Sequence, residues 1–359
     1  MNLKSYSVDP GPSLGFHFAC SEKKTCEAPE LLKTTFPNRP DIVRTANEID
    51  RMLIEILCEN GRAIGRDFTQ RTQLSEATIS RRLASLEESK LVRVRGYVDL
   101  QDSGCNSASI IRFSTKSSLD SFAQALAKNR CFYRVATVAG ENQVIALVAA
   151  ATPTKLLAEI DSVLAAHHHA TIEQSSEILS IIPPQEARRK FDRHSSNAPE
   201  DKTNTPRRCQ VHSDTIRALQ QDYRVHIARL AEMANISSPA ASAKIREVIN
   251  DQDIRPLVVV DPHFMARTIC ALLRVSVRRN IQKTAKVISD KFNPDWIFIC
   301  LQTEQILVEI SVADEVDLHR YRQELSNIGE VTSVASSPFS AVYKQTFDWN
   351  CDQPTHPAS

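Results

Sequence analysis

The sequence predicts an α+β protein containing two copies of one unit, a winged helix-turn-helix followed by a ferredoxin-like βαββαβ domain. Three observations lead to this prediction. Residues 74–91 place apolar side chains at helical spacing, with hydroxyl and arginine side chains largely elsewhere. Residues 107–182 then alternate between strand-like and helix-like patterns in the order β-α-β-β-α-β. The whole pattern returns 162 residues later without an insertion, so Ser75 corresponds to Ser237 and Leu83 to Ile245. Such a long period indicates two copies of a whole unit, because solenoid repeats run to roughly 20–50 residues.

The composition is that of a globular protein with real cores. The chain has 359 residues, of which 42% are hydrophobic, and this length suits two to four compact domains. The net charge of +1 gives no overall field that would attract nucleic acid. Nine cysteines are scattered without a C-x-x-C pair, which favours reduced thiols over a disulfide framework or a zinc site. No stretch approaches a signal peptide or a membrane span, so we expect a soluble cytoplasmic protein without a metal or cofactor.

The first predicted domain, a winged helix-turn-helix at residues 45–100, follows a leader. Residues 1–44 mix proline, serine and lysine without a period, which predicts a disordered leader. Thr45 and Glu48 are spaced as a capping box for a first helix, which Asn60-Gly61 would end. A second short helix is expected over residues 65–71.

The third helix of this domain has the pattern of a recognition helix. Ser75 can cap its start, and Ile79, Leu83 and Leu86 form one apolar stripe. Residues 91–100 then alternate as a strand, which supplies the wing. A short helix that turns hydroxyl groups and arginines outward can enter a DNA major groove, although an ordinary solvated surface helix has the same pattern.

Residues 104–184 form the predicted ferredoxin-like domain. Strands are expected over residues 107–115, 133–139, 143–150 and 171–182, and helices over 118–129 and 153–166. Gly140-Glu141-Asn142 is a hairpin signal between the second and third strands. Thr152-Pro153 caps the second helix, and Pro183-Pro184 ends the last strand.

The remaining segments complete the second copy. Residues 185–209 are a predicted basic flexible linker, which is either a solvated tether or an arm that contacts DNA phosphates. The second winged helix-turn-helix covers residues 210–262, and the second ferredoxin-like domain covers residues 266–346. Residues 347–359 are expected to be a loose tail.

The order of these motifs resembles that of the Lrp/AsnC family of feast/famine transcription regulators. The resemblance rests on Asp50, Leu53 and Ile54, on Leu57, Asn60-Gly61-Arg62 and Leu74-Ser75, and on Arg82, Leu86-Glu87, Leu91-Val92 and Ala139-Gly140-Glu141. The family pairs its small ligand-binding domains, called RAM domains, into dimers. The resemblance therefore implies a transcription regulator that is not an enzyme, binds double-stranded DNA and forms a pseudo-dimer or homo-oligomer. In one chain, the two small domains could pair with each other, and the tether would favour binding of the second DNA-binding domain.

Candidate DNA contacts lie on both predicted recognition helices. In the first copy they are Ser75, Thr78, Ser80, Arg81, Arg82 and Ser85, and in the second Ser237, Ser238, Ser242, Lys244 and Arg246. Residues 45–100 hold nine basic and nine acidic residues, and residues 210–256 hold six of each. DNA binding would therefore depend on local placement of charge, on avidity or on the linker. The second copy could instead be a purely architectural domain.

A small-molecule effector is expected at the glycine turn of the first small domain. The resemblance implies an amino acid or related metabolite near Ala139, Gly140, Glu141 and Gln143, whereas a plain hairpin is the alternative. The run His167-His168-His169 is interpreted as a solvated helix end, since adjacent imidazoles on one loop rarely converge on a metal.

Two other functions remain open. Tandem proteins of this architecture also resemble sirohaem decarboxylases, whose small domains form a tetrapyrrole cleft. Residues 130–134 (RCFYR) only faintly match their His/Tyr/Arg-rich segment, and the Trp-Pro-Tyr-Asn-like stretch is missing. A metabolite sensor or partner-binding protein without DNA binding is the third possibility.

Overall fold

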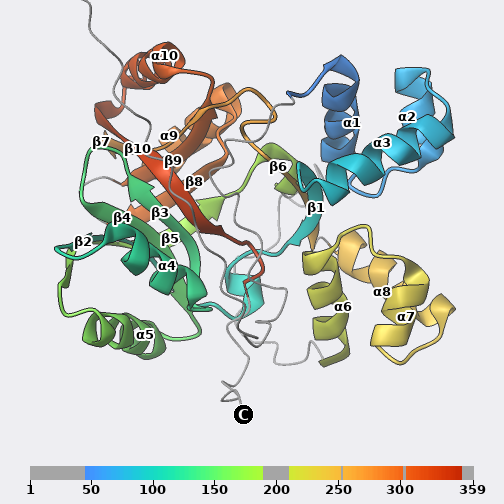
Figure 1. Cartoon of the computed structure of the whole chain (residues 1–359), viewed down its shortest axis with the longest axis horizontal. Helices are drawn as coiled ribbons and strands as arrows, with labels where there is room; N and C mark the ends of the chain where they lie inside the picture. The colour runs from blue at the N-terminus through green and yellow to red at the C-terminus, as the bar shows by residue number, and fades with distance from the viewer. Residues whose placement is uncertain (1–44, 189–209, 252–253, 302–304, 350–359) are drawn as a thin grey trace, which may run out of the picture. The chain divides into compact units, whose positions relative to one another are not determined.

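A computed structural model describes residues 45–188, 210–251, 254–301 and 305–349 (Figure 1). The expected leader at 1–44 therefore lies outside the described residues, as do most of the linker and of the tail. Two groups of helices flank a pair of short strands, and a larger strand assembly carries the remaining helices (Figure 1).

The first helical module follows the predicted order, with a shifted start. It contains α1 (Glu48–Glu59), α2 (Gly65–Thr72), α3 (Glu76–Glu88) and the strand β1 (Val92–Tyr97). The capping box of α1 joins Asn47 and Asp50, so the expected pair Thr45 and Glu48 was wrong by two residues. Ser75 caps α3 as expected, because its Oγ accepts the backbone N–H of Thr78 at 3.3 Å.

The second helical module repeats this order. It contains α6 (Gln210–Gln221), α7 (Ile227–Met233), α8 (Ser238–Asn250) and β6 (Arg255–Val260). Ser237 caps α8 by accepting the N–H of Ala240 at 3.4 Å. Pro239 lies in the first turn of α8, where its missing N–H costs no hydrogen bond.

The two helical modules form one body. Strands β1 and β6 pair antiparallel, with Val92 opposite Val260 and Tyr97 opposite Arg255. Arg62 donates to the carbonyl oxygens of Tyr223 and Val225, and Arg224 donates to those of Gly61 and Ala63. Their apolar core is shared, since Leu53, Leu57 and Ile79 pack in one cluster with Leu219, Ile254 and Phe264. The modules are thus joined by a core and not merely by a tether.

Each predicted βαββαβ segment is present. The first comprises β2 (Ser107–Thr115), α4 (Leu119–Lys128), β3 (Phe132–Val138), β4 (Gln143–Ala150), α5 (Pro153–Ala166) and β5 (Ala170–Ile182). The second comprises β7 (Ile269–Val277), α9 (Ile281–Phe292), β8 (Trp296–Leu301), β9 (Ile306–Val312), α10 (Glu315–Ser326) and β10 (Val331–Gln345). Short 3₁₀ helices lie at η2 (Gln101–Ser103) and η3 (Gln185–Ala187).

All eight of these strands belong to one closed barrel. Their order is β10-β3-β4-β2-β5-β8-β9-β7, and β7 pairs back to β10. The two segments meet at the antiparallel seams β3–β10 and β5–β8. Two separate sheets would leave four edge strands with unpaired backbone groups, and closure removes all of them. The small domains therefore pair within one chain, as a barrel rather than as two independent domains.

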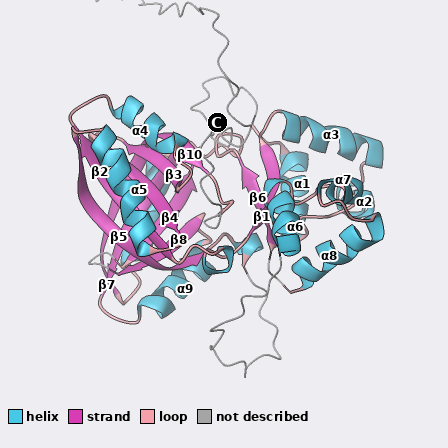
Figure 2. Ribbon diagram, turned by 90° about the horizontal axis from the view of Figure 1, so that it is seen from below, coloured by secondary structure: helices cyan, strands magenta, loops and turns pink. Residues whose placement is uncertain are grey.

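Strand alternation separates the barrel interior from the helix-covered outer side. Figure 2 shows α4 and α5 against the outer side of the strands, where Ile111 and Phe113 pack with Phe122 and Leu126. Neighbouring positions such as Ile110 and Leu272 face the interior and cluster there. The interior cavity between them measures about 10 Å³, which is room for about one water molecule.

The cysteines depart from expectation at one position. Cys58, Cys131, Cys270 and Cys300 are free thiols, but Cys105 is disulfide-bonded, so the expectation of reduced thiols throughout was wrong there. Among the described residues, no helix has the length and apolar character needed to cross a membrane.

Candidate functional site

A hollow of about 510 Å³ opens between α1, the segment after β6, the end of α9 and α10. Its volume falls within the range of roughly 300–1,000 Å³ that is typical of small-molecule sites. Three arginines line it, from three different parts of the chain: Arg51, Arg267 and Arg320. The other lining residues are Met265, Ala266, Phe292, Ser311, Val312, Ala313, Asp317, Tyr321 and Glu324.

The arginines make the hollow suitable for an anion. Arg51 lies exposed on α1, and Arg267 is 3.7 Å from the carboxylate of Asp295. Arg320 pairs with Asp317 one turn earlier on α10 at 2.7 Å. Guanidinium groups bind carboxylates through two parallel hydrogen bonds, so several of them in one hollow favour a ligand with more than one carboxylate.

Two aromatic rings form an apolar part of the wall. The rings of Phe292 and Tyr321 lie with centroids 5.1 Å apart and planes inclined by 43°. The Tyr321 hydroxyl is buried and has no hydrogen-bond partner within the described residues. Burial raises the pKa of this phenol, with further contributions from Asp295 and Glu324, so the group stays a neutral donor. A flat ligand can pack against these rings while the arginines hold its charged groups.

Ser311 connects the hollow to a half-buried acid, Asp295. Its hydroxyl donates to Oδ2 of Asp295 at 2.7 Å, and the Cys270 sulfur lies 3.4 Å from the same hydroxyl. The Asp295 side chain is 30% exposed. Burial raises the pKa of Asp295, while the Ser311 hydrogen bond and the charges of Arg267 and Arg134 oppose this rise.

Behind Asp295 lies an ion pair in the barrel interior. Arg134 on β3 contacts Glu309 on β9 at 2.7 Å, and both side chains are at most one-tenth exposed. Burial raises the pKa of Glu309 to about 7; Arg134 lowers it and Asp295 raises it further. Within the described residues, Nε and Nη1 of Arg134 have no hydrogen-bond partner, and its guanidinium lies 5.2 Å from the ring centre of Phe339. The site therefore combines a hollow lined by three arginines with two carboxyl groups whose pKa values are raised by burial.

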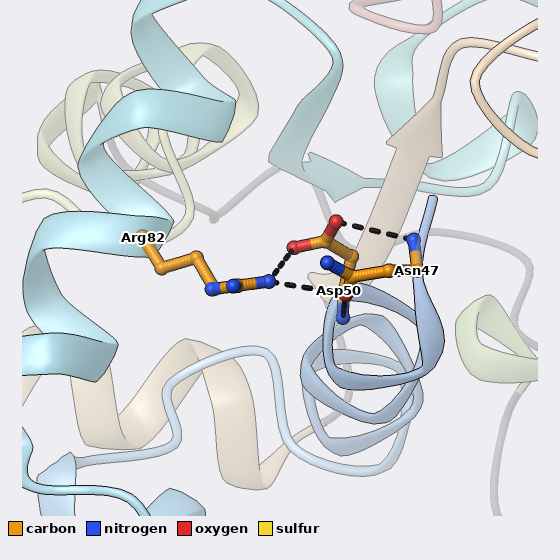
Figure 3. A network of polar contacts seen from close by, with 3 residues as sticks. All are labelled: Asn47, Asp50 and Arg82. Atoms are coloured by element: carbon orange, nitrogen blue, oxygen red, sulfur yellow. Dashed lines mark hydrogen bonds and ion pairs between the residues drawn. The ribbon is translucent and has the colours of Figure 1, made fainter. Parts of the chain in front are cut away.

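The predicted DNA contacts on α3 lie outside the hollow. One of them, Arg82, binds side chains of the protein itself. Arg82 Nη1 donates to Oδ1 of Asp50 at 2.8 Å and to Oδ1 of Asn47 at 3.0 Å (Figure 3). Its guanidinium thus binds the start of α1. Five other candidates are exposed on or beside α3, namely Ser75, Thr78, Ser80, Arg81 and Ser85.

The candidates on α8 form a weaker cationic surface. Ser237, Ser238 and Arg246 are exposed, whereas Ser242 and Lys244 are half-buried. The Arg246 Nε donates to the carbonyl of Ser242 one turn earlier at 3.4 Å.

The turn that was predicted to bind an effector is held to the barrel by hydrogen bonds. Gly140 has a φ of +74°, as a tight hairpin requires. Arg112 donates to Glu141 at 3.2 Å and to Gln143 at 2.9 Å, and the N–H of Ala139 donates to Pro338. None of these four predicted residues lines the hollow. At the end of α5, the His167 ring packs against Phe122 at 5.2 Å.

The residues of the hollow were not predicted from the sequence. Arg51, Arg267 and Arg320 are too far apart along the chain for spacing to relate them. The buried pair of Arg134 and Glu309 is visible in the sequence. Glu309 interrupts the apolar run at residues 306–312, and Arg134 interrupts the apolar run at residues 132–138. A charge within a buried strand needs a partner, so these two positions could have been singled out.

Comparisons with known proteins bear on the whole fold. No family model matches the sequence, and no curated protein resembles it in sequence. The crystal structure of siroheme decarboxylase NirDL, with an iron-uroporphyrin III analogue, matches 84% of this chain and 96% of that chain, at a TM-score of 0.55 and 12% identity. A second crystal structure of NirDL matches the same shares of both chains at a TM-score of 0.56 and 11% identity. The chain shares the fold of siroheme decarboxylase NirDL. An AsnC family regulator from Agrobacterium tumefaciens covers 38% of this chain at a TM-score of 0.36 and 17% identity.

These matches overturn the main functional expectation. The chain was predicted to be a DNA-binding transcription regulator and not an enzyme, but the structures that match most of its length are those of NirDL, an enzyme. The AsnC family regulator, by contrast, matches little more than a third of the chain. The winged helix-turn-helix pattern misled the prediction because a local fold alone does not define a function.

Proposed function

We propose that this protein is an enzyme that binds a carboxylate-bearing tetrapyrrole and removes carboxyl groups from it as CO₂. The match to NirDL over 84% of this chain carries this proposal. Siroheme and uroporphyrins are flat macrocycles with several carboxylate side chains, so their chemistry requires an aromatic surface and several cations.

The hollow beside α10 is the proposed binding site. Its volume of about 510 Å³ suits a large ligand, whereas the 10 Å³ cavity in the barrel does not. Phe292 and Tyr321 would contact the flat ring, and Arg51, Arg267 and Arg320 would bind its carboxylates.

The proposed chemistry needs a proton as well as a binding site. Loss of CO₂ leaves an electron pair on carbon, and a proton must replace the carboxyl group. Asp295 and Glu309 both have raised pKa values, mainly from burial, so they retain protons at pH values where exposed carboxyl groups have lost them.

We also infer that the two halves of the chain are copies of one unit. Strand β2 begins at Ser107 and β7 at Ile269, and α4 begins at Leu119 and α9 at Ile281, 162 residues apart in both cases. Arg62 and Arg224, which make reciprocal hydrogen bonds to the other module, are likewise 162 residues apart. This origin would explain how one chain forms a closed barrel that otherwise needs two.

Titration with iron-uroporphyrin III, followed by absorbance, tests binding. We expect a saturable spectral change, and Arg51→Gln and Arg320→Gln should each raise the Kd about tenfold, because a hydrogen bond to a charged group is worth about 1.5–3 kcal/mol. Arg66→Gln is the matched control, since Arg66 is an exposed arginine on α2 outside the hollow.

Incubation with siroheme, followed by mass spectrometry, tests the reaction. The expected product has lost CO₂ from one or more side chains. Absence of both a spectral change and a lighter product would contradict the proposed function. Binding that Arg66→Gln weakens as much as Arg51→Gln would contradict the placement of the site.

A further inference from the structure

Ser311 occupies a special position between the hollow and the protein interior. It lies at the end of β9, lines the hollow, and donates its hydroxyl proton to Asp295 at 2.7 Å. Asp295 in turn lies against β9, since its N–H donates to the carbonyl of Glu309 at 3.0 Å. A hydroxyl group rotates, so when Asp295 is protonated this hydrogen bond can reverse. Ser311 then accepts the proton of Asp295 and is free to donate its own proton into the hollow.

We propose that Ser311 delivers a proton to the carbon of the bound ligand that loses CO₂, and that Asp295 replaces this proton through the Ser311 hydroxyl. This inference rests on the proposed function and names the residues that complete its reaction. Ser311 would touch the ligand and be catalytic, whereas Asp295 would act through it.

The step balances without a further reactant. The bond between the side-chain carbon and its carboxylate breaks, CO₂ leaves, and the electron pair stays on the carbon. That pair forms a new C–H bond with the Ser311 proton. The serine oxygen takes the Asp295 proton at the same time, and the Asp295 carboxylate later regains a proton from solvent.

The surroundings of Asp295 favour this role. Arg267 and Arg134 are its positive neighbours. The titratable groups that interact with it are Glu309 on β9, Glu186 on η3, Tyr321 on α10 and Cys270 on β7. Burial raises the pKa of Asp295, while the Ser311 hydrogen bond and the two arginines lower it, so the carboxyl group keeps its proton to a higher pH than an exposed aspartate does.

The neighbouring thiol and phenol are poorer proton donors. Burial raises the pKa of Cys270, and it also raises that of Tyr321, so both hold their protons more tightly than usual. Cys270 also does not line the hollow, and its sulfur lies 3.4 Å from the Ser311 hydroxyl. The carboxyl group of Asp295 is therefore the acid that fits the relay.

Turnover of siroheme by the full-length protein tests the relay. Ser311→Ala should slow CO₂ release by about 100-fold to 10,000-fold, the usual contribution of a positioned proton donor, while the absorbance titration with iron-uroporphyrin III stays unchanged. Ser311→Thr keeps the hydroxyl and should restore most of the rate. Ser326→Ala is the control, because this α10 serine donates to the carbonyl of Arg322, away from Asp295.

The pH profile separates a relay from a structural role. Wild-type turnover should fall as the pH rises through the Asp295 pKa, and Asp295→Asn should remove this limb. Infrared spectra of the ligand-free protein provide an independent test at about pH 5, above the ordinary aspartate pKa of about 3.9. The protonated carboxyl band should lose the contribution of Asp295 in the Asp295→Asn variant, whereas the contribution of Glu309, whose pKa is about 7, should remain.

The possible failures are distinguishable. Active wild-type protein with an equally active Ser311→Ala variant would overturn the relay and leave the proposed function intact. Wild-type protein that neither binds nor decarboxylates tetrapyrroles would overturn both. Identical carboxyl bands in the wild-type protein and in Asp295→Asn would overturn the relay whatever the substrate.

Discussion

At the residue scale, Asp50 shows how a charged side chain fixes two helices. Its side chain has no exposed surface, and it completes the capping box at the start of α1. Arg82 reaches it from α3 at 2.8 Å (Figure 3). A buried carboxylate without a partner would be costly, so Arg82, which was predicted to contact DNA, stabilises the packing of α3 on α1.

Replacement of Arg82 should therefore affect stability. Arg82→Ala is expected to lower the free energy of unfolding by about 1.5–3 kcal/mol, the usual value of hydrogen bonds to a charged group. Arg81→Ala, its exposed neighbour, should change it by less than about 0.5 kcal/mol. Urea unfolding measures both, and equal effects would show that the contact with Asp50 contributes nothing.

Glu309 makes stability depend on pH. Its folded-state pKa of about 7 lies above the ordinary value of 4.5. The protonated form is thus favoured by folding, and its stabilising contribution is complete below about pH 4.5 and lost as the pH rises through 7. Urea unfolding at a series of pH values should show this decline, and Glu309→Gln should flatten it. A Gln variant with the wild-type slope would contradict the assignment.

At the element scale, the pairing of β1 with β6 depends on a position without a side chain. Gly96 lies opposite Pro256 in this pair. A Cβ at Gly96 would come within 2.3 Å of Ile254 Cδ1 and 2.8 Å of the Leu219 carbonyl oxygen. The close contact between the two helical modules therefore requires glycine here.

Substitution of this glycine should weaken the junction. Gly96→Ala is expected to destabilise the protein by about 1–3 kcal/mol, as overpacking usually does. Gly329→Ala is the matched control, since no atom lies within 4 Å of its added Cβ. Thermal unfolding compares the two, and a Gly96→Ala variant as stable as the control would show that the junction can relax.

At the scale of the whole molecule, the two halves of the sequence are joined by strand pairing. Seams β3–β10 and β5–β8 close the barrel, and β1–β6 joins the helical modules. The aromatic cluster of Tyr97, Trp296, Phe347 and Trp349 also links β1 to the barrel. Neither half could unfold without exposing the buried face of the other.

The chain should consequently unfold in one cooperative transition. Both tryptophans of the sequence lie in the barrel cluster, so their fluorescence reports the barrel, whereas far-ultraviolet circular dichroism reports the helices as well. Coincident urea transitions from the two signals are expected. An earlier loss of helical signal would show that the helical modules unfold independently.

The local elements could be predicted from the amino-acid pattern alone. Apolar periodicity predicted α3 with its Ser75 cap and α8 with its Ser237 cap, and the β-α-β-β-α-β order appears in both halves. These features depend on residues a few positions apart, where side-chain spacing and capping chemistry act directly. The capping box of α1 was misplaced because two candidate pairs lie only two residues apart.

How these elements combine became clear only from the folded molecule. Closure of the barrel pairs strands that are far apart along the chain, such as β3 with β10. The hollow likewise brings together Arg51, Arg267 and Arg320, whose separation along the chain leaves no periodic trace. Function was misjudged for the same reason: the local pattern of a helix-turn-helix does not reveal which sites the assembled molecule creates, because burial, pKa values and cavities arise only when distant segments pack.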